Sequence, residues 1–276
     1  MKFKEKKFGI SVIIPNYNRR EQLIRAVDSI YTQELDKVEI IVIDDCSEID
    51  PITFLGQYNK HGLPIRLFKN HKNSGPQVAR NLGIRRARFC YVSFLDSDDF
   101  FKLEKIDCMF DVIRKENPDF IYHGVDGCEK YNLISRFWHN TIGRFLHFSW
   151  LLSLLNPCVT PSVVIRRKIC LFNPNLRYSE DYSFYLSYVS FDTKVVYLDS
   201  NLSVVPREIG SVGGLSSSII KMRLGEIYGK WNILRHRSHL RYLIFALSLI
   251  TSSVRVFTDI LRRRYTVSEF IEFFKK

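Results

Sequence analysis

The 276-residue sequence lacks the features that mark several large classes of protein. Its longest apolar run, residues 242–250, falls well short of the roughly 20 residues that a membrane-spanning helix needs. The N-terminal apolar stretch is too short for a signal peptide. The six cysteines are scattered and form no C-x-x-C pair, which fits buried thiols in a reducing cytosol better than disulfides. These absences predict a soluble or peripheral cytoplasmic protein.

Low-complexity disorder is equally absent, because 46% of the residues are hydrophobic and 25% are charged. What the sequence does have is a formal net charge of +12, which suits nucleic acid, an anionic membrane surface or a phosphorylated substrate. This charge is uneven. Carboxylates cluster in the first half, whereas residues 230–264 are basic and apolar together.

Strand-like and helix-like segments alternate over the first 125 residues. Continuous apolar runs of strand length, rich in β-branched residues, occupy residues 10–15, 38–44, 65–70, 90–96 and 119–124. Helical stripes lie between them, and the expected helix caps are Asn18 with Glu21 as a capping box, Ser74, and Asp99. The alternation predicts an α/β fold with a mostly parallel sheet flanked by helices.

The pattern is weaker from residue 130 onward. Residues 156–168 contain one expected strand, Ser179 is the expected cap of a helix, and residues 193–206 look like two paired strands. Residues 210–218 form a loop rich in glycine and serine, and the remainder has helical character. We therefore divide the chain into a domain of residues 1–218, with halves 1–125 and 126–218, and a basic helical C-terminal segment, 219–276.

Polar residues follow the ends of four predicted strands. Tyr17 and Asn18 follow the first strand, Asp44 and Asp45 close the second, residues 73–80 follow the third, and Asp96 to Asp99 close the fourth. In sheets of this kind, ligands bind beyond the carboxyl ends of the strands. We expect the four strand ends to converge on one crevice that forms the active site.

The stretch FLDSDDF, residues 94–100, places three carboxylates within four positions, where like charges repel one another. A hard divalent cation offsets such repulsion, and Mg²⁺ usually takes one or two carboxylates and completes its shell with water and substrate phosphates. The alternative is a group of helix-capping charges. Beside three other polar strand ends, the cluster favours a metal site.

Five segments together resemble the family 2 inverting glycosyltransferases of the GT-A type. They are SVIIPNYNR, IIVIDDCSE, NSGPQVARNLGI, YVSFLDSDD and RYSEDYSFYL, in the family's order, over about residues 10–190. The resemblance implies a Rossmann-like GT-A fold and transfer of a sugar from a nucleotide-sugar with inversion at the anomeric carbon. The domain of residues 1–218 is then the GT-A domain, with a nucleotide-sugar half, 1–125, and an acceptor half, 126–218.

The resemblance also implies roles for individual residues. The base-stacking aromatic maps to Tyr17 beside Pro15, the base-recognising aspartate to Asp45, the diphosphate-side arginine to Arg80, the D-x-D motif to Asp96 and Asp98, and the catalytic base to Asp181 beside Glu180. Asp98 is the expected ligand of Mn²⁺ or Mg²⁺, and Asp45 suggests a UDP- or dTDP-linked sugar. Arg19 and Ser97 complete the expected donor-binding set, and Asp44, Asn73 and Arg207 are further candidates. Glu208 and Ile209 replace the family's usual basic or histidine position, so a metal-binding histidine is in doubt.

The C-terminal segment leaves two interpretations open. Its apolar residues and flanking arginines fit an interfacial helix on an anionic leaflet. They fit equally well a helix packed on the domain or on a second subunit, which would make a homodimer through the C-terminal helices. In the first interpretation the acceptor is a polyprenyl-diphosphate-linked glycan, and the protein is peripheral on the inner face of the cytoplasmic membrane.

Two other functions compete with glycosyl transfer. A nucleotidyltransferase also combines a Rossmann-like sheet with metal-binding carboxylates, but it would have a glycine-rich triphosphate loop after the first strand, where this chain has PNYNRRE. A nucleic-acid or anionic-surface binding module would explain the charge of +12, but acidic strand ends would repel a polyanion. We therefore expect no nucleic-acid partner.

Overall fold

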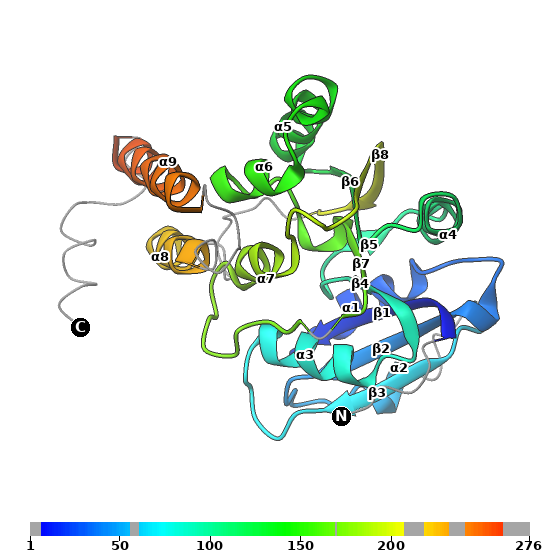
Figure 1. Ribbon diagram of the computed structural model, residues 1–276. Helices are drawn as coiled ribbons and strands as arrows, with labels where there is room; N and C mark the ends of the chain where they lie inside the picture. Colours follow the sequence, from blue (N-terminus) through cyan, green and yellow to red (C-terminus); the bar gives the residue numbers. More distant parts are fainter. Residues whose placement is uncertain (1–6, 56–60, 169, 207–217, 232–240, 262–276) are drawn as a thin grey trace.

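The computed structural model describes residues 7–55, 61–168, 170–206, 218–231 and 241–261 (Figure 1). Within them, one eight-stranded sheet has the strand order β3-β2-β1-β4-β7-β6-β8-β5. The strands are β1 Lys7–Asn16, β2 Val38–Asp44, β3 Ile65–Lys69, β4 Phe89–Phe94, β5 Phe100–Phe101, β6 Phe120–Asp126, β7 Val163–Arg166 and β8 Val195–Val204. The five strands expected before residue 125 are therefore confirmed as β1 to β4 and β6.

The two halves of the sheet differ in strand direction. The strands β3, β2, β1 and β4 run parallel, so their carboxyl ends meet at one edge. The strand β7 is antiparallel to both β4 and β6, whereas β6 and β8 are parallel to each other. In the sheet, β2 lies on one side of β1 and β4 lies on the other, so a topological switch point lies at the carboxyl end of β1.

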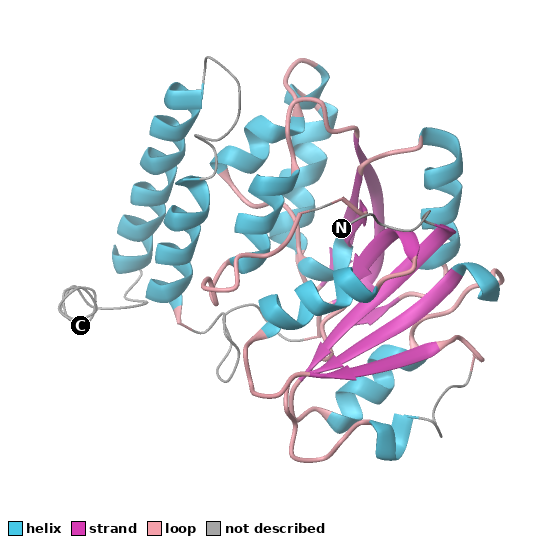
Figure 2. Cartoon of the chain, turned by 60° about the horizontal axis from the view of Figure 1, so that its bottom comes forward, coloured by secondary structure: helices cyan, strands magenta, loops and turns pink. Residues whose placement is uncertain are grey.

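Helices cover both faces of the sheet (Figure 2). The α-helices are α1 Arg20–Asp28, α2 Ile52–Leu55, α3 Pro76–Arg86, α4 Lys105–Glu116, α5 Glu129–Asn140, α6 Phe148–Leu154, α7 Glu180–Tyr188, α8 Ile219–Lys230 and α9 Arg241–Leu261. Three short 3₁₀ helices, η1 Leu35–Lys37, η2 Ile142–Arg144 and η3 Thr160–Ser162, lie in connections.

The apolar residues of each strand divide between two cores. In β1, Ile13 packs into a cluster with residues of α3, α6 and α7, whereas Val12 and Ile14 pack into a cluster with residues of α1 and α4. Successive side chains of a strand point to opposite faces, so a continuous apolar run can fill both cores. This is why the parallel strands were readable as unbroken apolar segments.

The expectation of two paired strands in residues 193–206 is wrong. A single ten-residue strand, β8, spans most of this segment and pairs in parallel with β6. The register between the two strands shifts at Gly124, opposite Asn201. A bulge of this kind absorbs extra residues without a turn, so the polar stretch at 199–201 does not reverse the chain.

The expected helix caps are displaced. Asn18 lies before the cap position of α1, with φ of 52°, and its side chain accepts a hydrogen bond from the Glu48 amide at 2.9 Å. The cap of α3 is Gly75 rather than Ser74, and Asp99 lies well before α4, whose cap is Glu104. Ser179 does occupy the cap position of α7, although its hydroxyl bonds to the carbonyl of Met222 in α8 instead of to α7.

The last two described helices, α8 and α9, pack side by side next to α6 and α7 (Figures 1 and 2). Of the interpretations left open for the C-terminal segment, packing of its helices on the domain is therefore present, and this packing leaves the contact with a membrane or a second subunit as a prediction. Among the residues that the structure describes, no helix has both the length and the hydropathy needed to cross a membrane.

Candidate active site

The ends of β1 and β2 lie side by side and form one wall of the candidate site. Asn16, the last residue of β1, donates a hydrogen bond from its amide to Asp44 Oδ1 at 3.1 Å. Asp44 is fully buried, and its carboxylate also accepts hydrogen bonds from the amide and hydroxyl of Ser47. Tyr17 directly follows Asn16 in the chain and is 46% exposed, while Pro15 is buried within β1. Asp44 thus joins two strand ends, and the ring of Tyr17 is accessible to a ligand.

Asp45 organises the loop that leads into α3. Its carboxylate accepts hydrogen bonds from the amides of Ser74 and Gly75 and from the side chain of Asn70, at 2.7–3.1 Å. Gly75 has φ of 91°, a conformation that glycine adopts without a steric penalty. Both oxygens of Asp45 are engaged, so contact with a nucleobase requires this carboxylate to share or exchange a partner. Base recognition by Asp45 stays a prediction, as does donor contact by the exposed Asn73 in the same loop.

Arg80 joins the end of β4 to the start of α7. Its guanidinium is 2% exposed, donates from Nη2 to Asp96 Oδ1 at 2.5 Å, and donates from Nη1 to Glu180 Oε1 at 2.8 Å. The two carboxylates raise the pKa of Arg80 against the opposing effect of its burial. A cation held between two carboxylates orients both of them. Arg80 therefore fixes the geometry of the D-x-D segment and of the expected base helix at once.

Asp98 is the second partly exposed carboxylate of the turn that follows β4. Arg19, at the end of β1, forms an ion pair with Asp98, and Arg25 of α1 donates to its backbone carbonyl at 3.1 Å. Ser97, between the two aspartates, is buried. The structure thus brings Arg19, Asp96, Ser97 and Asp98 together at the switch point between β1 and β4, as expected.

The oxygen ligands in this turn fit Mg²⁺ or Mn²⁺. Asp96 and Asp98 supply carboxylates, and their side chains are 30% and 27% exposed, so both can be reached from solvent. The described residues contain no group of three or more histidine, cysteine, aspartate or glutamate side chains placed to hold a metal. A site with one or two protein carboxylates is typical of Mg²⁺ that binds together with substrate phosphates.

Glu180 and Asp181 begin α7 and have different surroundings. Burial raises the pKa of Glu180 to about 7, although its partner Arg80 opposes this shift. Burial also raises the pKa of Asp181 above its usual value, and repulsion from Asp96 adds to the effect. One oxygen of Asp181 accepts a hydrogen bond from the Tyr182 amide at 2.7 Å. Glu180 is held by Arg80, whereas Asp181 forms no ion pair within the part of the chain that the structure describes.

Asp99 is the residue whose surroundings the sequence did not indicate. It is buried, and desolvation together with the charges of Asp96 and Asp98 raises its pKa to about 9. The nearby Lys105, also buried, donates to the carbonyl of Pro161 at 2.5 Å and lies over the ring of Phe101. Asp99 therefore belongs to the interior beneath the acidic turn and does not cap a helix. In the sequence, only the position of Asp99 next to two aspartates pointed to a raised pKa, and the same pattern fits a helix cap equally well.

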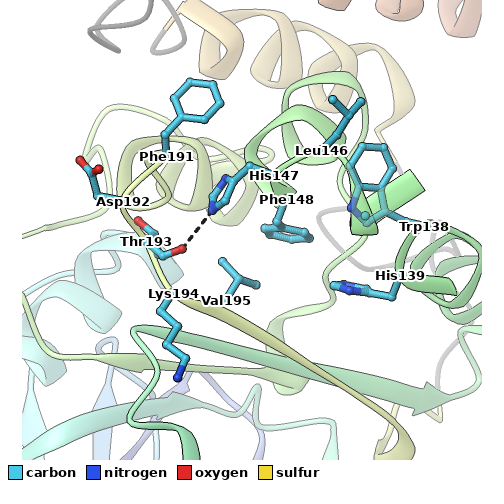
Figure 3. A pocket seen from close by; sticks show the side chains of 11 residues that line it. Trp138, His139, Leu146, His147, Phe148, Phe191, Asp192, Thr193, Lys194 and Val195 are labelled. Atoms are coloured by element: carbon cyan, nitrogen blue, oxygen red, sulfur yellow. Dashed lines mark hydrogen bonds between the residues drawn. The ribbon is translucent and has the colours of Figure 1, made fainter. Parts of the chain in front are cut away.

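A hollow of about 370 Å³ lies away from these strand ends (Figure 3). It is lined by residues of α5, α6 and the chain leading into β8, among them Trp138, His147 and Phe191. The ring of His147 contacts the carbonyl of Thr193 at 3.1 Å across one side of it. Val195 at its base starts β8, and β8 runs parallel to β6. The hollow is therefore at the amino end of these strands and holds none of the candidate residues.

Arg207 lies outside the residues that the structure describes, so its predicted diphosphate contact stays a prediction. The same applies to the expected loop at residues 210–217.

Several known proteins are similar to this chain. TuaG of Bacillus subtilis, a putative teichuronic acid biosynthesis glycosyltransferase, is 30% identical over 185 residues, which cover 64% of this chain and 71% of TuaG. An uncharacterized glycosyltransferase of Rickettsia felis is 30% identical over 220 residues, which cover 78% of this chain. The chain spans only 33% of that relative, and 20% of an uncharacterized glycosyltransferase of Rickettsia conorii.

Solved structures share the fold at lower identity. TarS of Staphylococcus aureus in complex with UDP-GlcNAc matches with a TM-score of 0.72 and 19% identity, covering 95% of this chain and 77% of the TarS chain. The mannosyltransferase PcManGT of Pyrobaculum calidifontis, in complex with GDP-Man and Mn²⁺, matches with a TM-score of 0.64 and 12% identity, covering 94% of this chain and 79% of the other. These likenesses confirm the expected GT-A fold.

The family itself follows from the sequence match and from the arrangement of the strand ends. Residues 11–172, more than half of the chain, match the model described as glycosyl transferase family 2. This range contains the carboxyl ends of β1, β2 and β4 and the residues that follow them, Asp98 among them. The chain belongs to glycosyl transferase family 2.

Proposed function

We propose that this protein transfers a sugar from a nucleoside-diphosphate sugar to a hydroxyl group of a glycan or lipid-linked acceptor, with inversion at the anomeric carbon. The observation that carries the proposal is the buried bridge from Asp96 through Arg80 to Glu180. It connects the acidic turn, where a diphosphate and its cation belong, to the first residue of α7, next to the expected base Asp181.

The general base in this proposal is Asp181. The acceptor hydroxyl attacks the anomeric carbon on the face opposite the leaving diphosphate, and Asp181 takes the hydroxyl proton as the new bond forms. One base and one displacement give inversion. Because burial raises the pKa of Asp181, its carboxylate is a stronger base than an exposed aspartate.

The donor end is assigned to the residues at the switch point. Asp98, with Asp96 beside it, would hold Mg²⁺ or Mn²⁺, which supplies charge stabilisation for the departing diphosphate. Arg19 lies close enough to Asp98 to contact a diphosphate bound there. Arg80 is already engaged by two carboxylates, so we assign it to positioning these groups, with direct diphosphate contact secondary. The exposed ring of Tyr17 would stack on the base of a UDP- or dTDP-linked sugar.

The substitution Asp181→Asn tests the proposed base. Asparagine keeps the size of the side chain but cannot accept the proton, so we expect kcat to fall by about 10²- to 10⁴-fold while the Kd for the donor nucleotide with Mn²⁺ stays within a factor of a few. The two quantities are measured by a sugar-transfer assay and by calorimetric titration. The anomeric configuration of the product, read by NMR, reports inversion in the same assay.

The matched control is Asp111→Asn in α4, whose side chain is 83% exposed and remote from the strand ends. It should turn over at the wild-type rate. Turnover of Asp181→Asn at the rate of this control would remove Asp181 as the base, and a product with retained configuration would remove the single-displacement mechanism.

The acceptor is proposed only by chemical class. A membrane-embedded acceptor, such as a polyprenyl-diphosphate-linked glycan, would place the enzyme on the inner face of the cytoplasmic membrane. The similarity to TuaG, which is named for teichuronic acid biosynthesis, supports a role in assembling a surface polysaccharide.

A further inference from the structure

The helix α9 places buried serines on the face that meets α8 and a row of exposed apolar side chains on its outer face. On its inner face, Ser248 and Ser252 are buried, and both accept hydrogen bonds from Lys230 of α8, at 2.7 and 2.8 Å. The outer face is formed by Tyr242, Leu243, Leu247, Ile250, Val254 and Phe257, whose exposed fractions are 40–64%. We call these six residues the outer stripe. An amphipathic helix that covers a core normally has the opposite orientation.

A buried charged network fixes α9 in this orientation. Glu226 of α8 accepts from Arg255 of α9 at 2.7 Å and from Arg223 at 2.9 Å, and Lys230 lies 3.5 Å from the same carboxylate. Turning the outer stripe inward would remove the contacts of Arg255 with Glu226 and of Ser248 and Ser252 with Lys230, and would place apolar side chains against these buried charged groups. The outward position of the apolar residues is therefore specified by the fold.

The charge around the outer stripe indicates what covers it. Residues 230–264 contain eight lysines and arginines and one aspartate. Lys230 and Arg255 belong to the network with Glu226, and the other six, residues 235, 237, 241 and 262–264, lie in the sequence at or beyond the two ends of α9. A second copy would bring charge of the same sign against this segment, whereas anionic headgroups would neutralise it. Within α9 the residues that flank the outer stripe, such as Ala246, Thr251 and Ser253, are uncharged, so they offer no ion pairs to a partner helix.

We propose that the outer stripe of α9 is the surface by which this protein docks on an anionic phospholipid bilayer. The apolar side chains enter the boundary between headgroups and acyl chains, and the basic residues at both ends of the helix contact the headgroups. The exposed Trp231, at the end of α8, stands beside Phe245 of α9 and adds an aromatic ring of the kind enriched at membrane interfaces.

Docking through α9 would place the bilayer two helices away from the expected base. The helix α8 packs between α9 and α7, and α7 begins with Glu180 and Asp181 (Figure 2). An acceptor anchored in the membrane would then meet the enzyme on the side of the molecule that carries α7. The docking itself does not depend on sugar transfer, so the two can be tested separately.

The test is sedimentation of the full chain with vesicles of phosphatidylcholine alone and of phosphatidylcholine with about one third phosphatidylglycerol. We expect binding to the anionic vesicles at low salt and weaker binding at high salt, because salt screens the attraction between the basic residues and the anionic headgroups. Ile250→Glu removes an apolar side chain from the membrane contact and adds a negative charge, so it should reduce the partition coefficient at least about tenfold.

The matched control is Leu133→Glu, on α5, where the leucine is 63% exposed. It should bind vesicles as the wild type does. Thermal unfolding of both variants shows that they are folded. The proposal is overturned if the wild type stays in the supernatant, or if both variants bind equally well. It is overturned too if light scattering finds a wild-type dimer that Ile250→Glu dissociates, because a second copy would then cover the outer stripe.

Discussion

At the residue scale, Arg80 is the centre of the candidate site. A surface arginine gains little from an ion pair, but Arg80 is buried and each of its two terminal nitrogens meets a carboxylate. One carboxylate comes from the turn after β4 and the other from α7, so the arginine couples the positions of these two segments. Its role is therefore structural and electrostatic at the same time.

Replacing Arg80 should be costly for stability. Arg80→Met leaves Asp96 and Glu180 without their common partner, and removing one partner from a buried ion pair costs about 3–5 kcal/mol. The free energy of unfolding is measured by urea titration. The exposed Arg85 on the same helix provides the control, because Arg85→Met should change stability by less than about 0.5 kcal/mol. Equal effects of the two substitutions would contradict the bridging role of Arg80.

Glu180 should make stability depend on pH. Its pKa rises from 4.5 to about 7 on folding, because burial disfavours the ionised form. A group with a raised pKa contributes stability that is fully present below the unfolded value and is lost as the pH rises through the folded value. We therefore expect stability to fall between pH 4.5 and 7 and Glu180→Gln to flatten this fall, as followed by urea titration at several pH values. The exposed Glu21→Gln should retain the wild-type slope.

At the scale of elements, the contact between α7 and α8 depends on two glycines. A Cβ at Gly225 would lie 2.1 Å from the carbonyl oxygen of Tyr178, and a Cβ at Gly229 would lie 3.1 Å from Cα of Ser183. Because glycine has no side chain, α8 can approach the segment that presents Asp181. The hydrogen bond from Ser179 to the Met222 carbonyl, at 2.9 Å, depends on the same approach.

A side chain at Gly225 should separate the two helices. We expect Gly225→Leu to lower the free energy of unfolding by about 1–3 kcal/mol through overpacking and to lower kcat by displacing α7. Calorimetric melting and the transfer assay measure the two effects. Tyr228→Ala, at an exposed position of α8, is the comparison and should leave kcat unchanged. Wild-type stability of Gly225→Leu would show that α8 does not need this close approach.

At the scale of the whole molecule, ligand binding should stabilise the fold. The proposed donor site combines the ends of β1, β2 and β4, which lie far apart in the chain, so unfolding would destroy it completely. A nucleotide at about 100 times its Kd then adds about 2.7 kcal/mol to stability.

A thermal-shift screen of nucleotides and nucleotide-sugars measures this effect. We expect a rise in Tm with UDP or dTDP compounds and Mn²⁺ or Mg²⁺, and a smaller rise when EDTA is present. Asp98→Asn should remove the metal-dependent part of the shift, whereas Asp111→Asn should keep it. A nucleoside triphosphate that stabilises the protein more than every nucleotide-sugar would favour a nucleotidyltransferase instead.

The sequence by itself determined the parallel half of the sheet and most of the candidate site. Strands buried on both faces must be apolar throughout, and parallel strands must end at the same edge, so local patterns were enough to place Tyr17, Asp45 and Asp96 at one edge of the sheet. The family motifs then pointed to Asp181, in a segment where the periodicity was weak.

Only the tertiary structure decided how the charged groups pair and which way the last helix faces. Arg80 could have been a free diphosphate ligand, and Asp99 could have been a cap, because neither spacing nor composition reports burial or partners. Residues 193–206 form one strand instead of the two expected, because β8 accommodates its extra residues in a bulge opposite Gly124 of β6. The sequence of β8 alone does not indicate this, since register depends on the neighbouring strand. The stripe of α9 is visible in the sequence as an apolar run, but its outward direction follows from the contacts of Glu226 with Arg255 and of Lys230 with Ser252, which join α8 to α9.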